Sequence, residues 1–318
     1  LAPPESPIAR FTLAHWPARW AHPLMGSAEL SGTWAISIDR TRTIRLSPEQ
    51  PLALGPLAFP SELLASLSPA TLTCAPHIDL SSDRLAVSIS DLRLTTPTGE
   101  SLDATLSAIR ENATGNIVLR GSVRAALPTV LAEKSSAFPL VAEAAFESQL
   151  EAEGTQLRLS AFTLTAQSAS SRGMPPYLSL RLTQPFTLDL ARLMPHAPAA
   201  GKQREWMQLS IQQLPLTFLS RWTPDHKING TFRTGEFSLS STSEGGLALH
   251  SRVPFAVDDL TVMAGDATRF RGDTTASLGV AWLGTRLGGK IDEINWTQAS
   301  GNRVHGQLGF SVDLAAKS

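Results

Sequence analysis

The stretch YLSLRLTQPFTLDL (Tyr177–Leu190) alternates apolar and polar residues over almost its whole length. The apolar residues all stand at even positions: Leu178, Leu180, Leu182, Phe186, Leu188 and Leu190. A two-residue period is typical of a β-strand with one apolar and one polar face. Pro185 cannot donate a backbone hydrogen bond, so it must lie at a sheet edge, a bulge or a bend. We therefore predict a long strand that is bent at Pro185.

The same alternation recurs along the chain and predicts an all-β fold. It is clear in residues 29–39 and 140–151, and again near the C-terminus at Leu308, Phe310 and Val312. A further run carries Leu247, Leu249, Val253, Phe255 and Val257 at odd positions. Strict alternation indicates antiparallel strands with one apolar face, since parallel strands buried on both faces read as continuous apolar runs. We expect about sixteen strands in a long, mostly antiparallel, twisted sheet.

Breaks in the alternation predict where strands bend or end. The apolar parity slips between Ile89 and Leu92, and again between Phe232 and Phe237, so each slip predicts a β-bulge. Glycine-containing turns are expected at residues 98–100, 153–154, 244–246, 288–289 and 300–302. The acidic pairs at residues 258–259 and 292–293 are interpreted as turn formers at strand ends.

Helical signals are few. Short helices are predicted at residues 60–68, 127–135 and 214–222, where apolar residues cluster at helical spacing. We interpret residues 1–318 as one elongated β-rich segment of a longer chain, because the sequence begins at Leu1 and not at a methionine. The proline-rich loops within residues 169–204 are considered as an internal boundary.

The composition argues against several classes of function. The formal charge is −1 and no dense basic run is present, so nucleic acid is not expected as a partner. A single cysteine, Cys74, excludes an intrachain disulfide and a cysteine-based zinc site. The seven histidines are scattered and no nucleophile, phosphate-loop or dinucleotide motif is present. We therefore expect no enzymatic activity, no cofactor and no metal site.

The segment LPLTFLSRWTPDHKINGTFRTGEFSLSSTSEGGLALHS (Leu214–Ser251) resembles the AsmA-like group of bacterial envelope proteins, which includes the TamB- and YdbH-like proteins. Residues 184–195 and 304–315 are similar in style. The resemblance implies a periplasmic protein that is anchored in the inner membrane. It also implies a long β-sheet curled into a hydrophobic groove along which phospholipid acyl chains pass, in lipid transport between membranes or outer-membrane biogenesis. Because no apolar run here is long enough to cross a bilayer, we expect the anchor outside this segment.

Physical reasoning leaves two architectures open for the apolar face. A sheet of more than about ten strands usually curls, and its apolar face then either lines a groove or packs against a second sheet. In the first case the face binds acyl chains, and the candidate lining residues are Leu178, Leu180, Leu182, Phe186, Leu188, Leu190, Leu247, Leu249, Val253, Phe255, Val257, Leu308, Phe310 and Val312. In the second case the chain is a secreted adhesion or carbohydrate-binding β-sandwich, with Trp34, Trp282 or Trp296 as platforms for sugars.

Overall fold

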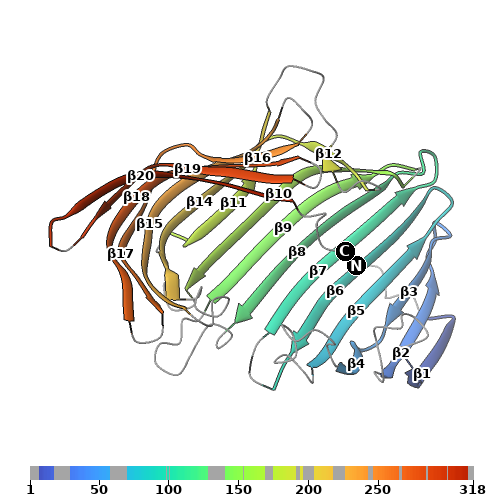
Figure 1. Cartoon of the computed structure of the whole chain (residues 1–318). Helices are drawn as coiled ribbons and strands as arrows, with labels where there is room; N and C mark the ends of the chain where they lie inside the picture. Colours follow the sequence, from blue (N-terminus) through green and yellow to red (C-terminus); the bar gives the residue numbers. More distant parts are fainter. Residues whose placement is uncertain are drawn as a thin grey trace. The chain divides into compact units, whose positions relative to one another are not determined.

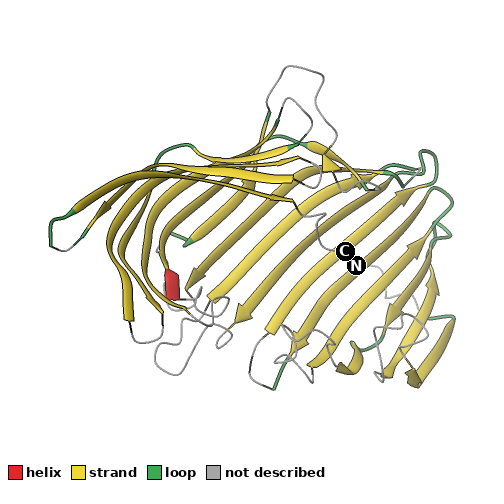
Figure 2. Ribbon diagram, viewed as in Figure 1, coloured by secondary structure: helices red, strands yellow, loops and turns green. Residues whose placement is uncertain are grey.

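The computed structural model describes residues 7–17, 29–57, 70–97, 99, 101–127, 140–152, 154–168, 175–190, 194–195, 204–217, 226–242, 246–264, 267–283, 286–298 and 300–313. Nearly all of these residues lie in antiparallel strands, as Figure 2 shows, and this confirms the prediction of an all-β fold. The chain divides into two compact units. Unit 1 comprises Leu1–Val130 and Ala137–Leu157, and unit 2 comprises Leu131–Ser136 and Arg158–Ser318.

Unit 1 is an antiparallel sheet in which strands follow one another in chain order (Figure 1). Its strands are β1 (Ala9–Pro17), β2 (Glu29–Ile38), β3 (Ile44–Pro48), β4 (Leu52–Leu57), β5 (Ala70–Leu80), β6 (Arg84–Thr95), β7 (Ser101–Glu111), β8 (Ile117–Leu127) and β9 (Leu140–Leu150). Strands β3 and β4 share one position in the sheet, since each pairs with β2 on one side and with β5 on the other.

Unit 2 is also an antiparallel sheet. Its strands are β10 (Gln156–Ser168), β11 (Leu178–Leu182), β12 (Phe186–Asp189), β13 (Met194–Pro195), β14 (Glu205–Pro215), β15 (His226–Ser241), β16 (Leu247–Ser251), β17 (Phe255–Ala264), β18 (Ala267–Leu283), β19 (Arg286–Thr297) and β20 (Arg303–Asp313). The sheet runs from β10 through β11, β14 and β15 to β18, β19 and β20. Strands β16 and β17 together fill the position between β15 and β18.

Three strand positions are interrupted directly before a proline-led segment. Pro51 precedes β4, Pro185 precedes β12 and Pro254 precedes β17. Because proline has no N–H to donate to the ladder, the strand ends a few residues earlier and restarts after the proline. The bend predicted at Pro185 is present, but the predicted single long strand was wrong, because the stretch forms two strands, β11 and β12.

Both β-bulges predicted from the slips in parity are present. The register of β6 with β7 shifts between Ile89 and Leu92, where Asp91 has a φ of 53°. The register of β15 with β17 shifts between Phe232 and Thr234. Each extra residue moves the following side chains to the other parity while keeping the apolar ones on one face.

Two sequence interpretations were wrong. The acidic pairs do not end strands but lie inside β17 and β19, at bulges where Asp259 and Glu293 have φ values of 50° and 52°. Aspartate tolerates this left-handed conformation better than most residues, which also makes it common in turns. Gly288 and Gly289 do not form a turn either, since both lie within β19.

Little helix is present in the described part of the chain. The windows 60–68 and 128–135 lie outside the described residues, as do residues 218–222. Leu127 ends β8, and residues 214–215 end β14 before a single short helical turn at residues 216–217. None of the described helical segments is long and apolar enough to cross a membrane.

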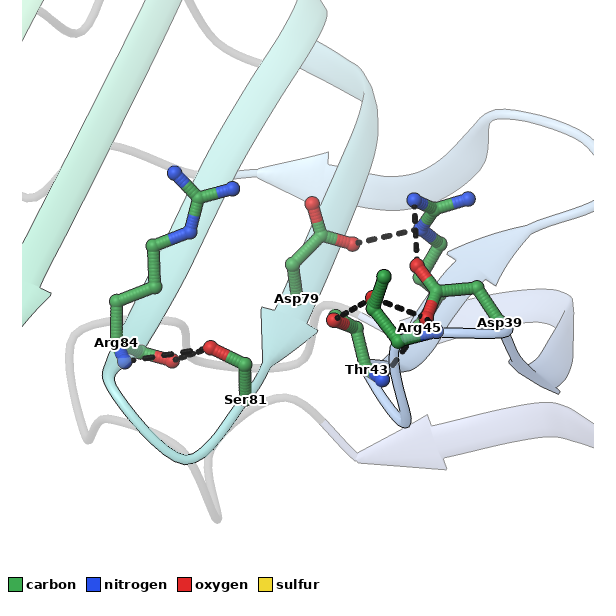
Figure 3. A network of polar contacts seen from close by, with 7 residues as sticks. Asp39, Thr43, Arg45, Asp79, Ser81 and Arg84 are labelled. Atoms are coloured by element: carbon green, nitrogen blue, oxygen red, sulfur yellow. Dashed lines mark hydrogen bonds and ion pairs between the residues drawn. The ribbon is translucent and has the colours of Figure 1, made fainter.

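The hairpin between β2 and β3 is held by the carboxylate of Asp39 (Figure 3). Its Oδ1 accepts hydrogen bonds from the backbone N–H groups of Thr41 (2.8 Å) and Thr43 (3.0 Å), and Oδ2 accepts one from Arg45 Nη2 (3.0 Å). The Thr41 hydroxyl, followed by the Thr43 backbone N–H, lowers the pKa of Asp39 below its ordinary value. Arg45 also lies 3.7 Å from Asp79 of β5, so the network ties the hairpin to the next strand.

Candidate functional site

The register of unit 2 places apolar residues of successive strands side by side on one face. Residues directly opposite in an antiparallel ladder point to the same side of the sheet. One row of direct partners is Leu164, Leu180, Leu209 and Phe237. A second row is Leu182, Met207, Leu239, Leu249, Val280, Gly289 and Phe310. We call the face that carries these rows the unit 2 apolar face; it extends from β10 to β20.

Three phenylalanines from different strands meet on this face. The ring of Phe232 lies 5.5 Å from that of Phe255, and Phe237 lies 6.2 Å from Phe255 and 6.3 Å from Phe232. A Cβ on Gly235 would meet the rings of Phe232 and Phe237, so this glycine makes room for them. The rings thus join β15 and β17 across the position where β16 ends.

The end of this face near the C-terminus is open to solvent. Trp282 of β18 is 41% exposed, and on β20 Leu308, Phe310 and Val312 are 55%, 37% and 46% exposed. We call these four residues the C-terminal apolar patch. Neighbouring large apolar side chains exposed together mark a surface for a ligand or a partner, whereas scattered ones need no explanation.

The exposure of the side chains on this face bears on the two architectures considered from the sequence. In a sandwich, the inward-facing side chains form a close-packed core and are largely buried. Here Leu178, Leu180, Leu182, Leu247 and Leu249 are only half-buried. Phe237 and Val257 are buried, so in the described part of unit 2 this face is buried at β15 and β17 and partly open at β11, β16 and β20.

The predicted lining residues do not all come together. Leu178, Leu180, Leu182, Leu247, Leu249, Leu308, Phe310 and Val312 lie on the unit 2 apolar face, with Phe255 and Val257 next to Phe232. Phe186 instead stacks on Trp206 at 5.3 Å, and Leu188 pairs with Pro195 of β13. Leu190 lies in a turn directly after β12, and Val253 lies in the bend before Pro254, 47% exposed and outside the ladder.

Unit 1 carries a similar apolar face, which the sequence interpretation did not single out as a site. Direct partners across β2, β3 and β5–β8 form the row Ile36, Leu46, Ile78, Val87, Ala108 and Leu119. At the end of these strands Ile44 pairs with Ile38 on one side and with Leu80 on the other, and all three are exposed. The alternation within residues 85–94 was the available signal; the partners across strands could not be read from it.

The opposite face of unit 1 carries ion pairs between direct cross-strand partners. Arg93 lies 2.6 Å from Asp103, Arg120 lies 3.2 Å from Glu147 and Arg124 lies 3.5 Å from Glu143. All these side chains are partly exposed to solvent. Such pairs contribute little to stability, but opposite charges in register disfavour slipped pairings.

The polar face of unit 2 contains a hollow of about 470 Å³, which sequence reasoning missed. It is lined by Arg181, Gln208, Glu236 and Arg252, among others. Arg181 donates two hydrogen bonds to Gln208 Oε1, at 2.6 and 3.1 Å, and Arg252 lies 3.9 Å from Glu205. The lining carries two arginines against Glu236, and Glu205 beside Arg252 supplies the second carboxylate near the hollow.

Nucleophile and metal chemistry find little support in the described residues. The Cys74 thiol, opposite Leu52, is half-buried, and burial raises its pKa and so disfavours the reactive thiolate. Nowhere in the described ranges do three His, Cys, Asp or Glu side chains gather as a metal site would require.

Comparison of the chain with protein-family models, with curated proteins and with solved structures finds no match.

Proposed function

We propose that this chain is a non-enzymatic, lipid-binding and lipid-conducting segment of a bacterial envelope protein. In this proposal phospholipid acyl chains lie against the unit 2 apolar face. The chain acts in the periplasm, in phospholipid transport between membranes or in outer-membrane biogenesis, and an anchor outside this segment holds it at the inner membrane.

One observation carries the proposal: an apolar face that continues strand after strand and stays partly open. The row from Leu182 through Leu249 to Phe310 crosses the sheet, and every residue of its last strand is exposed. Transfer of one methylene group from water to an apolar contact is favourable by about 0.8 kcal/mol. A long acyl chain that contacts the row on several strands therefore binds more tightly with each methylene group that it buries.

The chemistry of the face favours acyl chains over polar ligands. Its rows consist of leucine, valine, methionine and phenylalanine with one glycine, Gly289. Charged residues such as Arg181 of β11 and Lys290 of β19 stand at the alternate positions of the same strands. The face thus offers dispersion contacts without fixed hydrogen-bond partners, which suits a ligand that slides and does not need one orientation. The resemblance of residues 214–251 to AsmA-like envelope proteins points the same way and is the reason for proposing the periplasm.

The alternative of a carbohydrate-binding protein depends on exposed tryptophan rings. Trp282 is partly exposed, but Trp34 is buried and Trp296 stacks on Phe270 at 4.3 Å. Two of the three proposed platforms are thus occupied by neighbouring protein atoms, which favours the lipid proposal.

Two neighbouring substitutions in β11 test the proposal. Leu180 lies on the apolar face between Leu164 and Leu209, whereas Ser179 faces the other side, between Thr165 and Ser210. Leu180→Glu should weaken binding of a fluorescent fatty acid about tenfold or more, because a carboxylate in an acyl-chain site must be desolvated or displace the chain. Ser179→Glu introduces the same charge one residue away and should change the affinity less than about twofold.

Phospholipid that copurifies with the protein, measured by mass spectrometry after solvent extraction, provides the second readout. Wild type and Ser179→Glu should carry lipid, and Leu180→Glu should lose it while still melting cooperatively. Unchanged fatty-acid binding by Leu180→Glu would refute the proposal. So would aggregation of Leu180→Glu beside a folded Ser179→Glu protein, since that result indicates a closed core.

A further inference from the structure

Arg110 of β7 is a charged residue on the apolar face of unit 1. Its direct partners are Leu85 of β6 and Ile117 of β8. Direct partners share one face, and this one also carries Val87 and Ala108, two residues further along β6 and β7. The other direct partners on this face in the described strands β5–β9 are uncharged. A single guanidinium therefore stands among apolar side chains.

The row that contains Arg110 is the last one on this face before the hairpins at that end of the sheet. Arg110 is exposed, and its neighbours Leu85 and Ile117 are half-buried. We call this row of successive direct partners the unit 1 end row: Ile38, Ile44, Leu80, Leu85, Arg110, Ile117 and Leu150. It combines one exposed cation with aliphatic side chains that solvent reaches.

The charge of Arg110 is left without a partner, unlike those of several arginines on the opposite face. Arg93, Arg120 and Arg124 each lie within 3.5 Å of the carboxylate of a direct partner. No carboxylate pairs with Arg110 in the described part of the chain, and its aliphatic partners across the strands have no acceptor to offer. A guanidinium is a rigid fork of donors that fits two oxygens of a phosphate.

The face beside Arg110 has room for an acyl chain. Along β7, Ala108 and Leu106 are half-buried on this face and Ala104 is buried. Ala108 lies between Val87 and Leu119, which are both larger, so the surface is low next to Arg110. At about 3.4 Å per residue, the strand from Arg110 to Ala104 spans about 20 Å of apolar face. A tail lying there would place its head group at the exposed end of the strand.

We propose that Arg110 binds the phosphate of a phospholipid whose acyl chain lies along β7 on the apolar face of unit 1. The inference rests on the proposed function for the class of ligand. It adds a second binding face and a polar contact that holds the head group, where the unit 2 apolar face offers acyl contacts alone.

A cysteine beside Arg110 gives a local readout of binding. In a Cys74→Ala background, dioctanoylphosphatidylglycerol below its critical micelle concentration should slow the reaction of Ile117→Cys with a maleimide. Adding Arg110→Gln should raise the lipid concentration that halves the rate about tenfold, because a charge-assisted hydrogen bond is lost. Arg84→Gln removes the same charge at the same end of β6, on the opposite face, and should raise it less than about twofold.

The head group is tested with a lipid that lacks it. Dioctanoylglycerol has the same acyl chains without the phosphate, so it should protect Ile117→Cys about tenfold less well than the phospholipid. With Arg110→Gln the two lipids should protect equally, and Arg110→Lys should recover part of the preference. Equal protection by both lipids when Arg110 is present would overturn the proposal, as would a preference that survives Arg110→Gln.

Leu180→Cys in the same background reports separately on the unit 2 apolar face. Protection of Leu180→Cys without protection of Ile117→Cys would refute the site at Arg110 and leave the proposed function standing. Protection of Ile117→Cys that depends on Arg110, without protection of Leu180→Cys, would support the site at Arg110 and refute lipid binding on unit 2. Protection of Ile117→Cys that needs no lipid and grows with protein concentration would assign the unit 1 end row to a second copy and overturn the inference.

Discussion

At the scale of single residues, Gly288 and Gly289 of β19 are identical neighbours that differ in the space beside the backbone. A Cβ on Gly289 would lie 2.5 Å from Phe310 Cζ and 3.0 Å from Gly279 O, whereas one on Gly288 would lie 4.0 Å from its nearest neighbour. Gly289→Ala should therefore lower the free energy of unfolding by about 1–3 kcal/mol, because the ring of Phe310 must move off the sheet.

Gly288→Ala is the matched control on the opposite face. It should be neutral or should raise the free energy of unfolding by up to about 1 kcal/mol, since alanine has fewer unfolded conformations. Urea denaturation of both variants measures the difference. Equal effects at the two positions would show that the Phe310 ring does not rest on Gly289.

These glycines also show what residue patterns can and cannot predict. Pro185 was correctly placed at a bend because a missing N–H has the same consequence in any sheet. Gly288 and Gly289 were misread as a turn because glycine serves equally well in a turn and under an aromatic ring. Only the partner strand, which brings Phe310 across from Gly289, decides between these uses.

At the scale of elements, the pairing of β8 with β9 is marked by opposite charges. Arg124 and Glu143 are direct partners, 3.5 Å apart and about half exposed or more. Arg124→Glu should lower the free energy of unfolding by up to about 1 kcal/mol, since like charges would then face each other. Adding Glu143→Arg should recover most of that loss, because the exchanged pair is again complementary.

A double-mutant cycle by urea denaturation at low and at high salt measures this coupling. The coupling should shrink as salt screens the exposed charges. Independent, additive effects of the two substitutions at low salt would contradict a role for the pair in the register. Alternation predicted such strands well, but their partners depend on contacts between residues distant in sequence, and no single strand encodes them.

In the candidate site, alternation placed the residues of uninterrupted strands but not those beside the proline interruptions. The alternate residues of β11, β16 and β20 were correctly assigned to apolar faces, and the register then brings them into shared rows. Phe186 and Val253 were placed with them from parity alone. The interruptions before Pro185 and Pro254 end the ladder there, so parity no longer determines which way those side chains point.

At the scale of the whole molecule, low net charge coincides with exposed apolar surface. The formal charge is −1 at pH 7 and the isoelectric point is about 6.7, so copies repel one another weakly near neutrality. Light scattering at a fixed protein concentration should be highest near the isoelectric point. It should fall as the pH moves away from this value in either direction, because the net charge of each copy grows. Scattering that does not vary with pH would show that charge does not limit association.

The pairing of successive strands has a consequence for how such a chain can evolve. Within each unit, almost every strand pairs with the strands directly before and after it in the chain. Duplication or loss of one hairpin would change the width of the sheet by about two strand spacings of 4.8 Å and leave the other pairings intact. The length of the apolar face can therefore be adjusted in units of one hairpin, by recombination alone, without altering the rows of residues on the strands that remain.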